Sequence, residues 1–366
     1  MSVSAAFNQV MALGGVVVVF LIAGCQASPT EMVEQKPKIN LSISIDAPEV
    51  WGGEVRCAAT ACRLIAVEHE ENALVLHAIR GRESARLLDR VALAYHPDSA
   101  RWLSDDLVAA AVEGTGSIEM FRVTGERLLL LQRVEVGFAP RDVLLVSRED
   151  ARYQLLATPY SGNNVTWIEW TDGPNPTAKT VSQRICRSPW HPRKVPFGPG
   201  GAANGIVVGC LDDNSVLYMS GQVPGSATKI IAQFDHVPRN VVPSPSGKWW
   251  YVALEVGARN ARIDARTGAI QWLKAPVWGA VSAAPLTDDM VVWGEDQRVF
   301  LQKYSPEGEV LETRTLPASG FPTGLQLIDV DADGVSDLVV YNSAGKRVDV
   351  HFGPLWDNAI PAVSSR

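Results

Sequence analysis

Residues Ile328–Gly353 read IDVDADGVSDLVVYNSAGKRVDVHFG and contain one complete repeat unit of this chain. An apolar run, Leu338–Tyr341, is followed by a short polar stretch and then by a run that alternates apolar and polar residues, Arg347–Phe352. A short continuous apolar run indicates a buried strand, and a period of two indicates a strand with one buried face. The segment therefore predicts a strand, a turn and a returning strand.

The same unit recurs along the chain. Its apolar strand begins at seven positions: Leu64, Leu107, Leu155, Ile206, Tyr251, Val291 and Leu338. Neighbouring starts lie 40 to 51 residues apart, and a further strand led by proline often precedes them. Repeats of this length, with about four short strands each, are typical of β-propeller blades. We therefore predict an all-β, seven-bladed β-propeller over residues 39–354; a pair of β-sandwiches fits the even spacing less well.

The ends of the repeat array predict how the ring closes. The last unit has two obvious strands, while the N-terminal stretches INLSISID (39–46) and EVRCAA (54–59) lack a first partner in a unit of their own. Closing a ring removes exposed sheet edges. We therefore expect the N-terminal strands to complete the seventh blade, and residues 355–366 to form a C-terminal tail.

The first 25 residues have the pattern of an export signal. Met11–Ile22 is an apolar run too short to span a membrane comfortably, and small residues follow it. The ending LIAGC resembles the bacterial lipobox, which implies that Cys25 is lipidated, although no Lys or Arg precedes the apolar run. We predict a signal peptide (1–24), then the lipidated Cys25 and a polar tether (25–38), which places the protein in the bacterial cell envelope. An uncleaved membrane anchor is the alternative.

Four cysteines remain besides Cys25: Cys57, Cys62, Cys186 and Cys210. An even set in an exported protein favours disulfides. The shortest loops pair Cys57 with Cys62 and Cys186 with Cys210, although three connectivities are possible and free buried thiols are the alternative.

The aspartate-rich turn has the spacing of a metal loop. Asp329, Asp331 and Asp333 take positions 1, 3 and 5, Gly334 permits a sharp turn, and Val335 at position 7 and Asp337 at position 9 can complete the ligand set. Hard oxygen ligands at this spacing suit Ca²⁺ better than Mg²⁺, although position 12 lacks the glutamate of an EF-hand. We predict a structural Ca²⁺ rather than a catalytic one, since no histidine or second carboxylate cluster is near in sequence; a solvated turn is the alternative.

This last unit resembles VCBS and FG-GAP repeats, through its aspartate loop, the strand that follows and the closing Phe-Gly. Residues 243–272, PSPSGKWWYVALEVGARNARIDARTGAIQW, are similar instead to YVTN-type repeats. The resemblance implies a propeller with recognition or scaffold roles, and it implies that Asp337 supplies the closing calcium contact.

The sequence offers little evidence for a reaction. The net charge is −7 and no basic block occurs, which excludes a nucleic-acid partner of the usual kind. The six histidines form no HxH or HExxH motif, and GxSxG and phosphate-loop motifs do not occur. Singly placed histidines are expected to be structural or solvent-facing. The pairs Glu70–Glu71 and Asp212–Asp213 are expected to be solvated turns.

We therefore predict a non-enzymatic binding or scaffold protein, anchored to the membrane by lipid, with a protein or glycan partner on one propeller face. The alternatives are a lyase or hydrolase acting in the central channel, and an outer-membrane assembly-factor lipoprotein. The channel mouth discriminates between them: convergent His, Arg and carboxylate side chains favour an enzyme, whereas an apolar or aromatic rim patch favours a protein partner.

Overall fold

The computed structural model describes residues 41–58, 61–159 and 161–362. The predicted signal peptide, Cys25 and the tether lie outside the described residues. No helix within the described ranges is long and apolar enough to cross a membrane.

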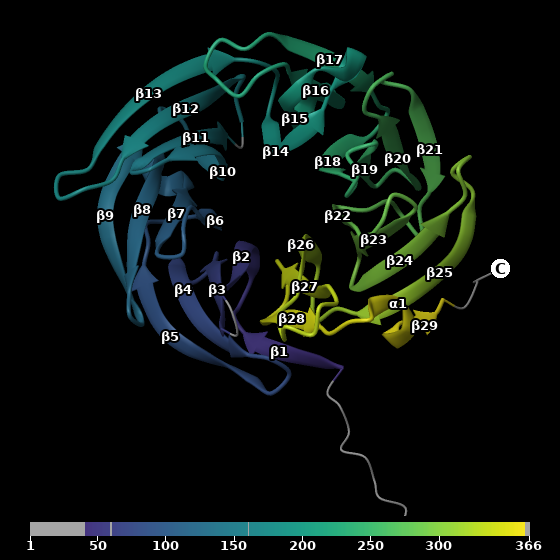
Figure 1. The fold of residues 1–366 in the computed structure, drawn as a ribbon, viewed down its shortest axis with the longest axis horizontal. Helices are drawn as coiled ribbons and strands as arrows, with labels where there is room; N and C mark the ends of the chain where they lie inside the picture. Colours follow the sequence, from purple (N-terminus) through teal and green to yellow (C-terminus); the bar gives the residue numbers. More distant parts are fainter. Residues whose placement is uncertain (1–40, 59–60, 160, 363–366) are drawn as a thin grey trace, which may run out of the picture. The chain divides into compact units, whose positions relative to one another are not determined.

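The described chain forms seven antiparallel sheets in a ring, so the prediction of an all-β, seven-bladed propeller is confirmed (Figure 1). Blade 1 comprises β2 (Val50–Ala58), β3 (Ala61–Glu68), β4 (Ala73–Arg80) and β5 (Ser84–Ala92). Blade 2 comprises β6 (Pro97–Trp102), β7 (Leu107–Val112), β8 (Ser117–Thr124) and β9 (Arg127–Glu135). Blade 3 comprises β10 (Pro140–Glu149), β11 (Arg152–Pro159), β12 (Asn164–Thr171) and β13 (Thr177–Arg184). Blade 4 comprises β14 (Pro189–Phe197), β15 (Ala203–Cys210), β16 (Ser215–Met219) and β17 (Thr228–Gln233).

The remaining blades follow the same order. Blade 5 comprises β18 (Val237–Pro243), β19 (Trp249–Glu255), β20 (Arg259–Asp264) and β21 (Ile270–Lys274). Blade 6 comprises β22 (Ser282–Pro285), β23 (Met290–Glu295), β24 (Arg298–Tyr304), β25 (Val310–Pro317) and β29 (Ile360–Pro361). Blade 7 comprises β26 (Pro322–Ile328), β27 (Asp337–Asn342), β28 (Arg347–His351) and β1 (Ser42–Asp46). Short helices lie at η1 (Glu113–Thr115), η2 (Pro199–Gly201), η3 (Leu211–Asp213) and α1 (Leu355–Asn358).

The apolar repeat strands are the second strands of the blades, and both of their faces are covered. Every residue of β7 and of β27 is buried. The core lies between neighbouring sheets: one cluster joins Ala109 and Met120 of blade 2 to Leu155 and Trp170 of blade 3. Full burial of one such aliphatic side chain stabilises the fold by about 1.5–3 kcal/mol. The even repeat in the sequence is therefore the repeat of this inter-sheet packing.

The two N-terminal stretches contribute strands to different blades. The strand β1 pairs antiparallel with β28, with Ile43 opposite Val350 and Ile45 opposite Val348. The stretch EVRCAA does not join it, because β2 pairs with β3 as the first strand of blade 1. In this register the apolar Val55 lies opposite Leu64, and β2 is the innermost strand of its blade (Figure 1).

The chain after residue 354 is not a free tail. Leu355 of α1 and Ala359 are buried in one cluster with Leu316 and Leu338, and β29 pairs with β25. Residues 355–361 are therefore packed against the sheets and paired with blade 6.

Antiparallel connectivity separates the loops onto two faces. We call upper the face with the connections between second and third strands and those that lead to the next blade. The lower face carries the connections between first and second and between third and fourth strands. His69 and His96 therefore lie on the upper face, whereas Arg82 and Asp331 lie on the lower face.

Candidate functional site

The first strands of the seven blades, β2, β6, β10, β14, β18, β22 and β26, surround the central channel (Figure 1). The channel contains a cavity of about 660 Å³, within the usual range for a small-molecule site. Its charged lining is mostly basic, with one carboxylate, Glu54, and four Arg or Lys side chains: Arg56, Arg101, Arg193 and Lys194. Trp51, Trp102, Tyr341 and His191 add aromatic surface.

Asp142, on β10, organises one side of this wall. It is 1 % exposed, and it lies 3.1 Å from Arg101 and 2.9 Å from His191 Nδ1. The Ser99 hydroxyl donates a further bond of 3.1 Å. Burial acts to raise the pKa of Asp142, but the Arg101 charge and the His191 bond outweigh it and hold the pKa well below its usual range. Asp142 is therefore an anion throughout the physiological pH range.

His191, at the start of β14, lines the channel next to this carboxylate. Its backbone is left-handed, with φ 44°, and burial lowers the pKa of its imidazole to about 4. The ring is thus neutral at neutral pH. Since an ionised Asp142 can accept but not donate, we assign the ring proton to Nδ1, which leaves Nε2 as an acceptor. An imidazole held in this way by a carboxylate is the arrangement of a general base.

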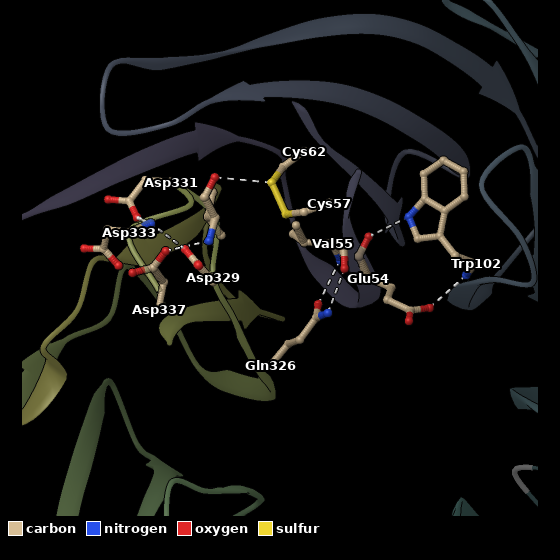
Figure 2. The surroundings of a disulfide bond; sticks show 11 residues. Glu54, Val55, Cys57, Cys62, Trp102, Gln326, Asp329, Asp331, Asp333 and Asp337 are labelled. Atoms are coloured by element: carbon tan, nitrogen blue, oxygen red, sulfur yellow. Dashed lines mark hydrogen bonds between the residues drawn. A yellow bond between two sulfur atoms is a disulfide. The ribbon is translucent and has the colours of Figure 1, made fainter. Parts of the chain in front are cut away.

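The one carboxylate of the cavity lining, Glu54, has its ionised form disfavoured by burial. Glu54 on β2 accepts a 2.8 Å bond from the Trp102 backbone N–H (Figure 2), and burial raises its pKa. Burial and the neighbouring Arg101 lower the pKa of Arg193, which reflects crowding of positive charges. These channel residues, Glu54, Arg101, Asp142, His191 and Arg193, are called the channel site below.

A second polar group lies on the upper face, where blades 1, 2 and 3 meet. We call His69, His96, Asp98, Glu113 and Arg141 the upper cluster. His69 Nε2 is 3.1 Å from His96 Nδ1 and 3.7 Å from Asp98 Oδ1. His96 Nδ1 is also 2.8 Å from Glu113, and Arg141 lies 3.0 Å from both carboxylates.

Burial controls the charges of this cluster. It raises the pKa of Asp98 to about 8, although the Arg141 charge opposes the change. Burial, with His96 beside it, lowers the pKa of His69 to about 4. Both groups are therefore held mainly in their neutral forms near pH 7.

His77, His351 and the two acidic pairs lie outside the channel site and the upper cluster. His77 and His351 are buried in strands β4 and β28. Glu71 lies 3.6 Å from Arg90, and Asp213 forms an ion pair with Arg187. None of these lines the channel cavity.

The acidic loop, Asp329–Asp337, connects β26 to β27 on the lower face (Figure 2). The carboxylates of Asp329, Asp331 and Asp333 gather within 4.8 Å of one another, as the spacing predicts. Asp337 is fully buried, and its oxygens accept bonds of 2.7 Å from the backbone N–H groups of Val330 and Gly353. Three carboxylates of the set thus fit a hard cation, while the fourth already serves the backbone.

Arg82, in the turn between β4 and β5, reaches this loop from blade 1. Its guanidinium forms an ion pair with Asp331 and another, of 2.9 Å, with Asp333. Gln326 joins the same two blades by bonding both backbone groups of Val55, at 2.8 and 2.7 Å (Figure 2). The protein therefore supplies one cation of its own to the acidic loop, where the ring is joined.

Both predicted cysteine pairs are bonded in the structure. Cys57–Cys62 closes the first hairpin of blade 1 on the lower face, and its Cys62 Sγ lies 3.3 Å from the Val330 carbonyl oxygen (Figure 2). Cys186–Cys210 joins the connection between blades 3 and 4 to β15 on the upper face. Two disulfides indicate an oxidising, non-cytoplasmic location.

Of the two discriminating features, the structure shows the convergent polar groups. The convergent His, Arg and carboxylate groups are those of the channel site and the upper cluster. Exposed apolar side chains also lie on the upper face, at Val256, Val277 and Trp278, with Trp278 66 % exposed. Single exposed apolar residues are common on protein surfaces, so these three do not by themselves mark a docking surface.

The sequence contained a signal for the channel site that strand prediction alone did not use. The proline-led stretches HPDSARW, APRDVLLV and HPRKVPFG carry charged residues directly after proline. These stretches became β6, β10 and β14, which face the channel. Once the blade order is known, the charged residues of these innermost strands mark the channel wall at Arg101, Arg193 and Lys194, and the upper cluster at Asp98 and Arg141.

No protein-family model and no curated protein matches this sequence. Solved propellers match its fold. The protein titled U3-55K is 13 % identical, covers 85 % of this chain and 98 % of its own, and has a TM-score of 0.63. A catalytically inactive variant of virginiamycin B lyase from Staphylococcus aureus, solved with quinupristin, is 10 % identical over 85 % and 99 % of the two chains, with a TM-score of 0.62. Saccharomyces cerevisiae Sqt1 is 8 % identical over 88 % and 100 %, with a TM-score of 0.60. At these identities the similarity establishes the fold alone.

Proposed function

We propose that this chain is an envelope-anchored propeller that binds a small anionic ligand in its central channel. The observation that carries the proposal is the charge of the cavity lining, where four Arg or Lys side chains face the carboxylate of Glu54. They still outnumber the carboxylates when Asp142, which pairs with Arg101, and Asp105, which pairs with Arg56, are counted. A concave site in which one sign of charge predominates concentrates ligands of the opposite sign.

The positions of the basic groups support the same ligand class. Arg101 donates to the Gly53 carbonyl oxygen at 2.9 Å and pairs with Asp142, so its guanidinium is held in place before any ligand arrives. Arg193 lies farther from the carboxylate, at 3.9 Å. A planar guanidinium offers two parallel donors to a carboxylate, phosphate or sulfate group. The ligand class is therefore an oxyanion on a small organic body that can rest against Trp51 or Trp102.

The cellular setting is part of the proposal. The two disulfides agree with export, and the LIAGC ending supports a lipid on Cys25 that would tether the propeller to a membrane in the bacterial envelope. A Ca²⁺ ion held by Asp329, Asp331, Asp333, the Val335 carbonyl and Asp337 would stabilise the ring junction. The partner of such a protein would be the anion itself, or a protein or glycan that presents it.

Binding of phosphate, sulfate and citrate tests the proposal, with titration calorimetry on the full chain in detergent. We expect saturable binding of at least one of them, and a loss of at least tenfold in affinity in Arg193→Gln. Arg187→Gln is the matched control, because Arg187 pairs with Asp213 away from the channel. Absence of binding, or equal loss in both variants, would contradict the proposal.

The second candidate function is a lyase or hydrolase in the same channel. The bond between His191 Nδ1 and Asp142 favours it, because it orients a neutral imidazole beside basic groups that could stabilise an oxyanion. A 4-nitrophenyl ester and 4-nitrophenyl phosphate are suitable first probes. Turnover that His191→Gln abolishes, while anion binding persists, would favour the enzyme over the binding protein.

A further inference from the structure

We infer that His69, His96 and Asp98 form a binding site for a divalent first-row transition-metal ion of the zinc type. The inference concerns the upper cluster, separate from the channel cavity and from the acidic loop.

The ligand geometry carries the first step. One ligand atom from each of the three side chains lies within 4.8 Å of the other two. Ligands at about 2.0–2.1 Å from a tetrahedral ion lie about 3.3 Å from one another. The spacings of 3.1 Å between His69 Nε2 and His96 Nδ1, and 3.7 Å between His69 Nε2 and Asp98 Oδ1, bracket that value. A small adjustment thus places all three atoms around one ion.

The donor set selects the class of ion. Two imidazole nitrogens and one carboxylate oxygen suit Zn²⁺, Co²⁺ or Ni²⁺, whereas Ca²⁺ and Mg²⁺ prefer oxygen ligands. Three protein ligands also leave a fourth coordination position open. His96 is the most exposed of the three, with 27 % of its side chain accessible, so the open position is nearest solvent on that side.

A buried carboxylate is the second, independent observation. Asp98 is 5 % exposed, and neither of its oxygens has a hydrogen-bond donor in good geometry. Its neighbour Arg141 faces two carboxylates, Asp98 and Glu113, each at 3.0 Å. One guanidinium can pair fully with only one of two ionised carboxylates, so a bound cation would supply the partner for the second, as buried charges are normally paired or metal-bound.

Two of the ligands lie in upper-face connections, His69 between β3 and β4 and His96 between β5 and β6, whereas Asp98 lies in β6. His96 takes a left-handed conformation, with φ 63°, and its N–H donates to Asn72 Oδ1 at 2.8 Å. The Gly114 N–H donates to the Tyr95 carbonyl oxygen at 2.8 Å, and a side chain on Gly114 would meet that oxygen at 2.2 Å. Glu113 Oε2 lies 2.8 Å from the same His96 Nδ1, so an ion bound at this nitrogen would take the place of that contact.

A Co²⁺ titration of the untagged, metal-free full chain tests the inference. We expect one equivalent to produce visible d–d absorption, which Zn²⁺ abolishes by displacement, and we expect Zn²⁺ to raise the thermal midpoint. His69→Gln and His96→Gln should each weaken binding at least tenfold. His236→Gln, on the same face, and the double variant Asp331→Asn/Asp333→Asn should leave binding unchanged.

Two outcomes would overturn the inference: no Co²⁺ binding by the wild-type chain, or binding that both histidine variants retain. Should His69→Gln fail to fold, as shown by its circular dichroism, His96→Gln decides the question because His96 is partly exposed.

Discussion

The acidic loop and the upper cluster are opposite cases of charge in this propeller. The loop is local: its carboxylates come from one stretch of nine residues, and backbone N–H groups and Arg82 compensate them. The upper cluster is assembled from four separate segments across three blades, and it retains a buried carboxylate without good hydrogen bonds. The loop has the recognisable motif, whereas the cluster and the adjoining channel site contain the buried groups with shifted pKa values, such as Asp98, His69 and His191, that are typical of functional sites.

A recognisable sequence motif and a candidate ligand-binding site therefore need not coincide in this protein. The acidic loop is a local turn, and its ion pairs with Arg82 join blade 7 to blade 1. A group whose charges are satisfied only by distant elements depends on the whole ring, so damage to it is expected to have larger effects. Four predictions test this ordering, from the largest effect to the smallest.

Asp142→Asn is expected to cause the largest loss. The substitution leaves Arg101 buried without its carboxylate partner, and breaking a buried pair in this way costs about 3–5 kcal/mol. Urea unfolding measures the loss of free energy. Glu126→Gln is the matched control, because its ion pair with Arg86 is exposed and should contribute nothing measurable. Equal losses in both variants would remove the contrast between the assembled site and a surface pair.

The two disulfides extend the comparison to the upper and lower faces. Loop-closure entropy predicts that breaking Cys186–Cys210, which spans 24 residues, costs about 3.5 kcal/mol, against about 2 kcal/mol for the shorter loop of Cys57–Cys62. Alanine pairs at each bridge, compared by thermal unfolding, check the order. The reverse order would mean that the lower junction carries more of the stability than the upper face does.

Acid should weaken the channel site through His191. Its pKa is about 4 in the fold against 6.5 for the free group, so between these values the unfolded chain binds a proton that the native chain does not. The stability contribution is therefore complete above pH 6.5 and is lost as the pH falls toward 4, by up to about 1.4 kcal/mol per pH unit. His191→Gln should show a correspondingly flatter pH profile between pH 6.5 and 4; parallel profiles for the two proteins would contradict this assignment.

Arg82→Gln should have the smallest effect, about 1 kcal/mol, because the guanidinium is partly exposed and solvent screens its ion pairs. If the acidic loop binds Ca²⁺, a chelator should lower the melting temperature, and more so in the variant, where no guanidinium replaces the ion. Differential scanning calorimetry with CaCl₂ or EGTA measures both. If neither CaCl₂ nor EGTA changes the melting temperature of either protein, the Ca²⁺ prediction is wrong and the loop is a turn that Arg82 neutralises.

The sequence by itself determined the architecture. Strand periodicity, the spacing of Leu64, Leu107 and the later repeat starts, and the shortest cysteine loops are local properties, and local properties are visible in a linear string. The gathering of the three loop aspartates followed in the same way, because ligands four residues apart remain close whatever the rest of the chain does.

Only the tertiary structure decided which charges meet. Arg82 and Asp331 are 249 residues apart, and Asp142 and His191 are 49 apart. The first contact requires blade 7 to lie beside blade 1, and the second requires β10 and β14 to be neighbouring innermost strands. The tertiary structure likewise decided the partner of β2, which pairs with β3 in blade 1 and does not join blade 7. A strand pattern specifies that one face is buried, but the partner of that face is chosen by the summed packing of all seven sheets, and no single stretch of sequence contains that sum.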